Sequence, residues 1–529
     1  MRHDETSSDL EPLVSRALAG EAAADLAASL PAPPPLGAVE ALQRRAVPLL
    51  DRSPRQGYAL AALAYALAAR GREQRPDARG WITLLGRVAI TLAAAERRRA
   101  RYAQAEHLLD EASRLLAESA GPKDLARCQA ERAWLYRDLD RYREAEEGFR
   151  QVIAALQKAT ARGPARRGRR ARDEADAEMS MEACLAYSCR GLGQTLRSLN
   201  RYAEACRWTE LAREGYARAG LPLAAARCET DMAFHLLLSD REEAARRLAR
   251  AREAFTQAGA AADLAEVNHY TALLRHEQTH FTEALSLFQA ARAVFEAEGL
   301  AMRAALTEVN EANTHFRMGA LEKALALGQR ARAHMAEAGR SLMVIACDVN
   351  LGLVYHAMGQ ARQALAMFER ALALCEERGL PVDAARCRVN MALVYEQVGD
   401  YARALSLCQR ARDELDAAGI AMYRAHCDQN LGALYLRIGQ YERALERFGA
   451  ARETFADEKM PGYAARCEMQ MAAASLEMGD WEKAQRLLEQ AQATCRAQGM
   501  ALGVDLCDAL LAEVEERRGE AARASTRYR

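Results

Sequence analysis

The chain has 529 residues, half of them hydrophobic, and Ala, Leu, Glu and Arg dominate while Pro is scarce. This composition is typical of an almost entirely helical protein. The 73 Lys and Arg residues balance the 73 Asp and Glu residues, so no overall field attracts nucleic acid or an anionic membrane. A charged partner therefore has to bind to a local cluster of charged residues.

The N-terminus lacks the pattern of an export signal. Its first twenty residues, MRHDETSSDLEPLVSRALAG, are polar and acidic, whereas a signal peptide is basic and then apolar. The longest apolar stretch, from Tyr58 to Ala69, is too short and too rich in Ala to cross a bilayer. We therefore expect a soluble, cytoplasmic protein without a membrane partner.

Residues 1–80 are less regular than the rest of the chain. The Pro-rich segment PAPPPLG at residues 31–37 predicts a stiff linker. A possible helix near Asp9 to Leu30 precedes it, and a helix pair from about Ala38 to Arg70 follows it. We interpret residues 1–80 as an irregular helical region whose helix pair is a degenerate N-terminal cap.

A repeat of forty residues fills most of the remaining chain. Four segments that begin at Cys347, Cys387, Cys427 and Cys467 align without gaps. Each predicts two amphipathic helices with a Gly corner between them, because Gly adopts the positive φ that ends a helix. These corners are Gly359, Gly399, Gly439 and Gly479. A single helix pair cannot bury both of its apolar faces, so neighbouring pairs must stack.

The same register extends towards the N-terminus. Earlier corners are expected at Gly319, Thr279, Ser239, Asn200, Asp140 and Ala100, forty residues apart within one residue except for sixty between Asp140 and Asn200. About ten units are therefore predicted over residues 81–499. The extra residues at 158–178 are Arg-rich and then acidic, which predicts a disordered loop. Residues 500–529 are expected to form a C-terminal capping helix or a truncated repeat.

The unit resembles the tetratricopeptide repeat. The positions that carry this resemblance are Leu431, Gly432, Tyr435, Gly439, Tyr441, Ala444, Phe448 and Ala451. The unit departs from the family after Ala451, where the usual Pro is missing and about six residues are added. Similar long units occur in scaffold proteins, in peptide-pheromone receptors and in arrays associated with CHAT peptidases. The resemblance implies an all-α, right-handed α-solenoid (superhelix) of about ten helix-turn-helix TPR units, with the first helices on the concave face.

One motif suggests a metal site. Residues 276–280, HEQTH, fit the HExxH pattern of zinc peptidases, in which two His at i and i+4 on one helix hold the metal. The repeat register places Thr279 at a corner, so His276 ends a first helix and His280 lies in the following turn. We therefore expect no metal here, and we interpret His276 as a variation in a binding groove.

Cysteines recur at one position of the repeat. Cys189 and Cys228 match this position within one residue, and the other members are Cys128, Cys347, Cys387, Cys427, Cys467 and Cys507. This regularity favours a small buried hydrophobe between helices. Successive members lie a whole repeat apart, which is too far for a disulfide.

Asparagines recur three residues later, at Asn310, Asn350, Asn390 and Asn430. They have two possible roles, a hydrogen bond that fixes repeat stacking or a bond to the backbone of a ligand. Other residues expected on the concave face are Arg386, His426, Arg466, Gln429, His356, Glu396 and Arg437. This mixture of amides, cations and apolar groups suits an extended or helical peptide, acidic segments included.

No Gly-rich phosphate loop, no GxSxG motif and no Cys/His pair outside the repeat pattern occurs in the sequence. We therefore expect a protein that is not an enzyme and has no cofactor. The leading hypothesis is a scaffold or sensor that binds a protein or peptide, with nucleic acid disfavoured as a partner. One alternative is a regulatory subunit or fragment that controls an effector such as a CHAT peptidase, encoded beyond this chain or on a partner. Another is a small-peptide receptor without enzymatic output.

Overall fold

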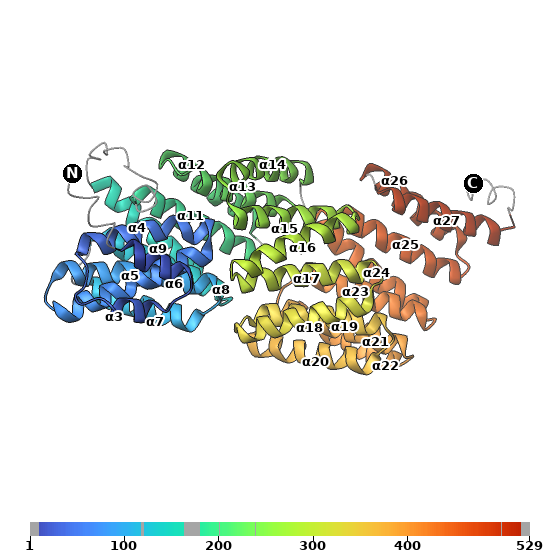
Figure 1. The fold of residues 1–529 in the computed structure, drawn as a ribbon. Coiled ribbons are helices and arrows are strands. Elements are labelled where there is room, and N and C mark those ends of the chain that lie inside the picture. Colours follow the sequence, from blue (N-terminus) through green and yellow to red (C-terminus); the bar gives the residue numbers. More distant parts are fainter. Residues whose placement is uncertain are drawn as a thin grey trace. The chain divides into compact units, whose positions relative to one another are not determined.

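The computed structural model describes residues 10–117, 121–162, 180–199, 201–237, 240–498 and 500–519. Within these ranges the chain is all-α, an α-solenoid of helices that follow one another in tandem (Figure 1). The chain divides into two compact units, residues 1–343 and residues 344–529. The limits at residues 80 and 499 that the sequence suggests stay predictions, since this division does not test them.

The first unit begins with four helices before the repeats. These are α2 (Glu11–Leu18), α3 (Ala23–Ala28), α4 (Leu36–Arg52) and α5 (Pro54–Gln74). The possible helix between Asp9 and Leu30 is two short helices in the structure, because Gly20 adopts a φ of 103° between them. The pair expected from Ala38 to Arg70 corresponds to α4 and α5.

Helix pairs follow in the first unit, each with a first helix and a second helix. The pairs are α6 (Arg79–Arg98) with α7 (Tyr102–Ala117), α8 (Pro122–Asp138) with α9 (Tyr142–Arg162), α11 (Met181–Ser198) with α12 (Tyr202–Arg218), α13 (Pro222–Leu236) with α14 (Arg241–Ala258), α15 (Ala261–Glu277) with α16 (Phe281–Ala297), and α17 (Ala301–Arg317) with α18 (Leu321–Glu337). Because α9 continues to Arg162, the start of the insertion expected at 158–178 is helical, and residues 163–178 lie outside the described residues.

The second unit continues the series. Its pairs are α19 (Ser341–Ala357) with α20 (Ala361–Arg378), α21 (Pro381–Gln397) with α22 (Tyr401–Ala417), α23 (Ala421–Arg437) with α24 (Tyr441–Asp457), and α25 (Pro461–Glu477) with α26 (Trp481–Ala497), and α27 (Ala501–Arg517) follows them. The division between the units falls within the first turn of α19. Ten pairs from α6 to α26 thus lie in the described residues, in agreement with the ten units expected.

The corners between first and second helices confirm the repeat register. Gly439 has a φ of 76°, and Gln440 N–H donates to the Tyr435 carbonyl at 2.9 Å, which closes the end of α23. Ala100, Asp140 and Thr279 adopt a φ of 62° without being Gly. Ser239 and Asn200, which were also expected at corners, lie outside the described residues. A left-handed residue therefore ends the first helix wherever a corner is described.

Within each unit the first helices lie next to one another. Successive first helices, such as α21 and α23 or α13 and α15, contact directly, and no comparable contact joins successive second helices in the described ranges. The first helices are therefore the more closely spaced layer. We call the side of this layer that faces away from the second helices the inner face. None of the described helices combines the length and apolar character needed to cross a membrane.

The N-terminal helices of the first unit pack back onto its later repeats. Asp51, at the end of α4, accepts hydrogen bonds from Arg98 of α6 at 2.7 Å and from Arg227 of α13 at 2.8 Å. The Glu298 carboxylate accepts from the Ser53 hydroxyl and from the Arg55 backbone N–H, both at 3.3 Å. A carboxylate at this helix start complements the positive end of the α5 dipole.

A second contact links distant repeats within the first unit. Asp140, at the corner between α8 and α9, accepts a hydrogen bond from the Arg340 guanidinium at 2.9 Å and one from the Leu342 backbone N–H at 3.2 Å. Both side chains are nearly enclosed, with 5% of Asp140 and 10% of Arg340 exposed. The first unit is therefore closed on itself by buried ionic contacts between residues far apart in the sequence.

The Asp140 contact gives a stability prediction. Asp140→Asn keeps a residue that tolerates positive φ but removes the charge that Arg340 requires. Leaving a buried guanidinium without its carboxylate costs about 3 kcal/mol. We expect urea unfolding of the full chain to show this loss in the free energy of unfolding. Glu242→Gln, at a side chain 91% exposed, is the control and is expected to change it by less than about 0.5 kcal/mol. Equal effects of the two variants would contradict the assignment.

Candidate functional site

The inner face of the first unit is filled by its own charged side chains. Arg97 of α6 bonds Asp138 of α8 at 2.7 Å, and Arg190 of α11 bonds Asp231 of α13 at 2.6 Å. Burial by itself would raise the pKa of Asp231, but the Arg190 guanidinium outweighs it and holds that pKa below its usual value. Within each buried pair, the two charged groups neutralise each other. This face therefore offers few unpaired polar groups to a ligand.

The two candidate residues in the first unit are engaged internally. His276 Nδ1 lies 2.9 Å from Thr314 Oγ1, and Asn310 Nδ2 lies 3.2 Å from Nε2 of His269, in each case bridging α15 and α17. The other nitrogen of His269 lies 2.9 Å from Thr307 Oγ1. Asn310 therefore makes a hydrogen bond between successive repeats.

The HExxH residues adopt the geometry expected from the repeat register. Helix α15 ends at Glu277, Thr279 has a φ of 62°, and His280 precedes α16. The prediction of a corner here is confirmed, and the two His side chains do not share one helical face. Among the described residues, no group of three or more His, Cys, Asp or Glu is placed to hold a metal ion.

In the second unit the Asn side chains are unbonded. Asn350 of α19, Asn390 of α21 and Asn430 of α23 are each partly buried, and we call these three residues the amide ladder. No hydrogen bond joins any of their side chains to another residue that the structure describes. In the next repeat Gln470 of α25 occupies the equivalent position, and it accepts a hydrogen bond from Gln429 at 2.7 Å. The three Asn therefore keep donor and acceptor groups available.

Arg466 of α25 lies on the inner face of the same unit, and its charge has no ion-pair partner among the described residues. Its guanidinium donates to Gln429 Oε1 at 2.7 Å and lies 5.2 Å from the centre of the Tyr463 ring. No carboxylate in the described ranges lies within ion-pair distance of it. Arg386 differs, because Asp383 on the same helix pairs with it at 2.7 Å. Gln429 is nearly fully buried and serves to orient Arg466.

Aromatic rings surround His426 beside this cation. Its ring centre lies 4.9 Å from that of Phe455 and 5.0 Å from that of Tyr463, both edge to face. Burial lowers the pKa of His426, and Arg466 lowers it further, so this imidazole is neutral near pH 7. Tyr463 and Tyr423 remain 37% and 39% exposed. Sequence reasoning missed both, although they occupy the third position of successive first helices and their forty-residue spacing was readable.

The candidate residues near the corners have mixed surroundings. Glu396 of α21 pairs with Arg437 of α23 at 3.2 Å, which links successive first helices. His356 of α19 is partly buried, and its Nδ1 has no hydrogen-bond partner among the described residues. Of the candidates in the second unit, the amide ladder, His356 and Arg466 therefore keep unused hydrogen-bonding or charged groups.

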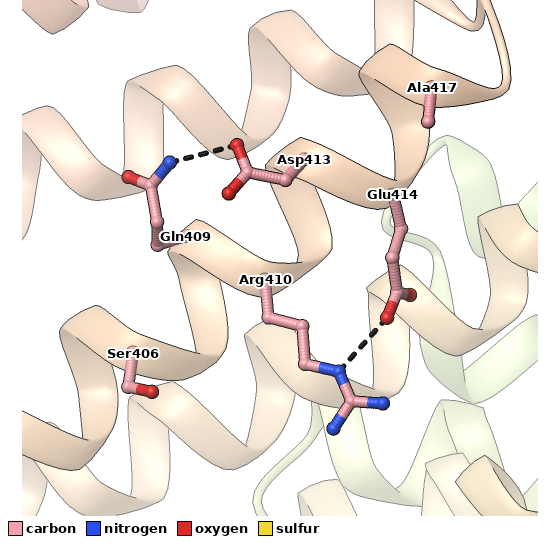
Figure 2. Close-up of a pocket in the computed structure, with 6 residues that line it drawn as sticks. All are labelled: Ser406, Gln409, Arg410, Asp413, Glu414 and Ala417. Atoms are coloured by element: carbon pink, nitrogen blue, oxygen red, sulfur yellow. Dashed lines mark hydrogen bonds and ion pairs between the residues drawn. The ribbon is translucent and has the colours of Figure 1, made fainter.

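A shallow depression in the second unit lies elsewhere, on a second helix. Figure 2 shows that its lining comes from α22 alone: Ser406, Gln409, Arg410, Asp413, Glu414 and Ala417. Its polar groups satisfy each other along the helix, Gln409 with Asp413 and Arg410 with Glu414, both at 2.9 Å. A depression on a single second helix is a solvated surface, and its residues serve below as controls.

Models of the tetratricopeptide repeat match residues 84–158 and 303–377, and a further model of the same repeat matches residues 387–418. Together with the helix pairs, the corners and the forty-residue period, these matches identify the chain as a tetratricopeptide-repeat protein with long units. No curated protein matches the sequence.

Several solved structures are similar in fold. The apo form of RapI is 13% identical, with 65% of this chain and 95% of that chain covered and a TM-score of 0.49. The apo quorum sensor NprR from B. thuringiensis is 11% identical, with coverages of 71% and 98% and a TM-score of 0.47. A Rap protein complexed with competence and sporulation factor is 15% identical, with coverages of 80% and 99% and a TM-score of 0.46. At these values the likeness carries no functional argument.

The His269 contacts predict a pH dependence. Burial lowers the pKa of His269 to about 4, and Arg303 adds to the effect, whereas an unfolded His titrates near 6.5. Between these values the unfolded chain binds a proton that the folded chain does not, so stability falls as the pH drops from about 6.5 to about 4. The full effect is about 3 kcal/mol. Thermal unfolding across this range measures it.

Two variants separate this effect from general acid sensitivity. His269→Gln removes the titrating group, so its unfolding temperature is expected to depend less on pH over the same window. His107→Gln changes an exposed His and is expected to retain the pH dependence of the unsubstituted chain. A slope unchanged in His269→Gln would rule out this histidine as its source.

Proposed function

We propose that the inner face of the second unit binds an extended peptide segment of a partner protein. The observation that carries this proposal is the amide ladder, whose three side chains at consecutive repeats have no hydrogen-bond partner in the described part of the chain. The protein would then act as a scaffold or sensor, a role that the identification of tetratricopeptide repeats supports.

The chemistry of an Asn side chain fits a peptide backbone. Each amide offers two N–H donors and a carbonyl acceptor, so one side chain can bond both the C=O and the N–H of an extended strand. Contacts of this kind recognise the backbone and leave specificity to neighbouring pockets. The contrast with Asn310, which bonds His269, favours the second unit as the binding region because its amides are not already used.

The groups beside the ladder favour a ligand with an acidic side chain. Arg466 has no carboxylate partner among the described residues, and Tyr463 places an aromatic face beside it. A carboxylate from the ligand would form a charge-assisted hydrogen bond there. The alternative of a subunit that controls a CHAT peptidase stays a hypothesis, since no observation on the described residues favours it.

Selection from a random peptide library displayed on phage tests the proposal. We expect the full chain to enrich peptides that contain Asp or Glu, and the affinity of a selected peptide to fall at least tenfold in the double variant Asn390→Ala and Asn430→Ala. Loss of two hydrogen bonds at about 1 kcal/mol each accounts for that factor. Isothermal titration calorimetry measures the dissociation constants.

A matched control lies on the outer surface. The double variant Ser406→Ala and Gln409→Ala changes two polar residues of α22 in the same unit and is expected to leave the affinity unchanged. Failure to enrich any peptide, or equal losses in the two double variants, would refute binding at the amide ladder. Circular dichroism confirms that each variant keeps its helical content.

A further inference from the structure

Two junctions between repeats in the second unit bring together pairs of cysteines. Cys387 of α21 and Cys507 of α27 belong to the ladder of first-helix cysteines. Cys375 lies near the end of α20 and Cys495 near the end of α26, each preceding its ladder cysteine by twelve residues. All four are free thiols and are fully buried. These pairs were not predicted from the sequence, because only ladder members a whole repeat apart were compared.

The two cysteines of each pair lie on helices that pack against each other, and Cys495 and Cys507 belong to one buried cluster. The thiols are close enough to affect each other's pKa: Cys375 lowers the pKa of Cys387, and Cys507 opposes the rise that burial causes in the pKa of Cys495. The packing around the second pair is tight, because a Cβ added at Gly503 would meet Cys495 Sγ at 2.7 Å. Each pair lies between the second helix of one repeat and the first helix of the next.

Other junctions of the same unit lack a thiol at the position of Cys375. Leu415 occupies the position of Cys375 one repeat later and packs in the same buried cluster as Cys427. Phe455 occupies it two repeats later and clusters with Cys467. A large apolar side chain is therefore compatible with the fold at this position, so packing alone does not require sulfur there.

We propose that Cys375 with Cys387, and Cys495 with Cys507, are two intramolecular dithiol sites that hydroperoxides oxidise to disulfides. The sites differ from the proposed peptide groove and do not depend on it. A disulfide needs sulfurs about 2.05 Å apart and Cβ atoms facing each other. The two cysteines of each pair lie across one junction between packed helices, so a small shift of those helices brings the sulfurs to that geometry.

The oxidation proceeds in two balanced steps. The thiolate of one cysteine attacks a peroxide oxygen, which gives a sulfenic acid and releases water or an alcohol. The partner sulfur then attacks the sulfenic sulfur, and the hydroxyl group leaves as water with the partner's proton. The two thiols lose two electrons and two protons in total, and the peroxide is the oxidant. The second step is fast because the resolving thiol lies across the same helix junction.

The surroundings support Cys387 as the attacking sulfur of its pair. Cys375 lowers the pKa of Cys387, although burial opposes this effect. A lower pKa raises the thiolate fraction near neutral pH, and the thiolate is the reactive form. Burial raises the pKa of the ladder members Cys427 and Cys467 to about 12. These thiols are thus poorer nucleophiles, and each shares its buried cluster with a large apolar side chain at the position of Cys375.

Oxidation would have a structural consequence next to the amide ladder. Cys387 lies on α21 three residues before Asn390. A disulfide to Cys375 would fix α21 against α20 and remove the opening motion by which peroxide reaches the buried sulfurs. The oxidised chain is therefore expected to exchange the amide hydrogens of α20 and α21 more slowly than the reduced chain.

Mass spectrometry of the full chain tests the proposal. The reduced protein is treated with hydrogen peroxide, its remaining thiols are alkylated, and its peptides are mapped. We expect crosslinked peptides that join Cys375 to Cys387 and Cys495 to Cys507, while Cys427 and Cys467 are recovered alkylated. Cys387→Ser is expected to abolish only the first crosslink, and Cys507→Ser only the second.

An added thiol provides a matched positive control. Leu415→Cys places a thiol at the position of Cys375 opposite Cys427, so a third intramolecular crosslink is expected after peroxide treatment. Unfolding temperatures of the reduced variants show whether each is folded. Intermolecular disulfides, sulfinic acids at the paired positions, or oxidation of Cys467 as fast as that of Cys387 would each overturn the assignment.

Discussion

The repeat depends on the close packing of a bulky side chain of the second helix against a small residue of the first. The Phe448 ring is fully buried against Gly432, where an added Cβ would lie 2.7 Å from it, and Phe368 packs on Gly352 in the same way. Since protein interiors are close-packed, such an approach fixes the distance between the two helices. The forty-residue period follows because each pair leaves an apolar surface that the next pair must cover.

The same packing decides which surface is left for function. Once the stripes that face the second helix and the neighbouring pairs are buried, a single side of each first helix remains. In the first unit this side is covered, because α4 packs against α15 and its Asp51 bonds Arg227 of α13. In the second unit the corresponding side carries unbonded amides and exposed tyrosines. Identical local folding thus leads to a closed surface in one unit and an accessible one in the other.

The sequence predicted the fold correctly where helix and corner positions depend on residues near in the chain. Corners at Thr279 and Asp140 were placed correctly although neither is Gly, because the spacing of the flanking helices identified them. The closure of the first unit was not predicted, since the contact between Asp140 and Leu342 spans 202 residues and leaves no periodic signal. The sequence also did not show which of the recurring Asn side chains is hydrogen-bonded. Such a bond depends on the facing residue of the preceding repeat, which for Asn310 is His269.

Buried ion pairs explain how the amide ladder keeps its spacing. Arg388 of α21 is 1% exposed and pairs with Glu376 of α20 and Glu414 of α22. Asp428 of α23 is fully buried and accepts from Arg412 of α22 and Arg447 of α24. Because loss of one partner would leave a buried charge unpaired, these ion pairs hold α21 and α23 each to both neighbouring second helices. Asn390 and Asn430 follow these anchors by two residues, so their amides are held in place before a ligand arrives, which lowers the entropy cost of binding.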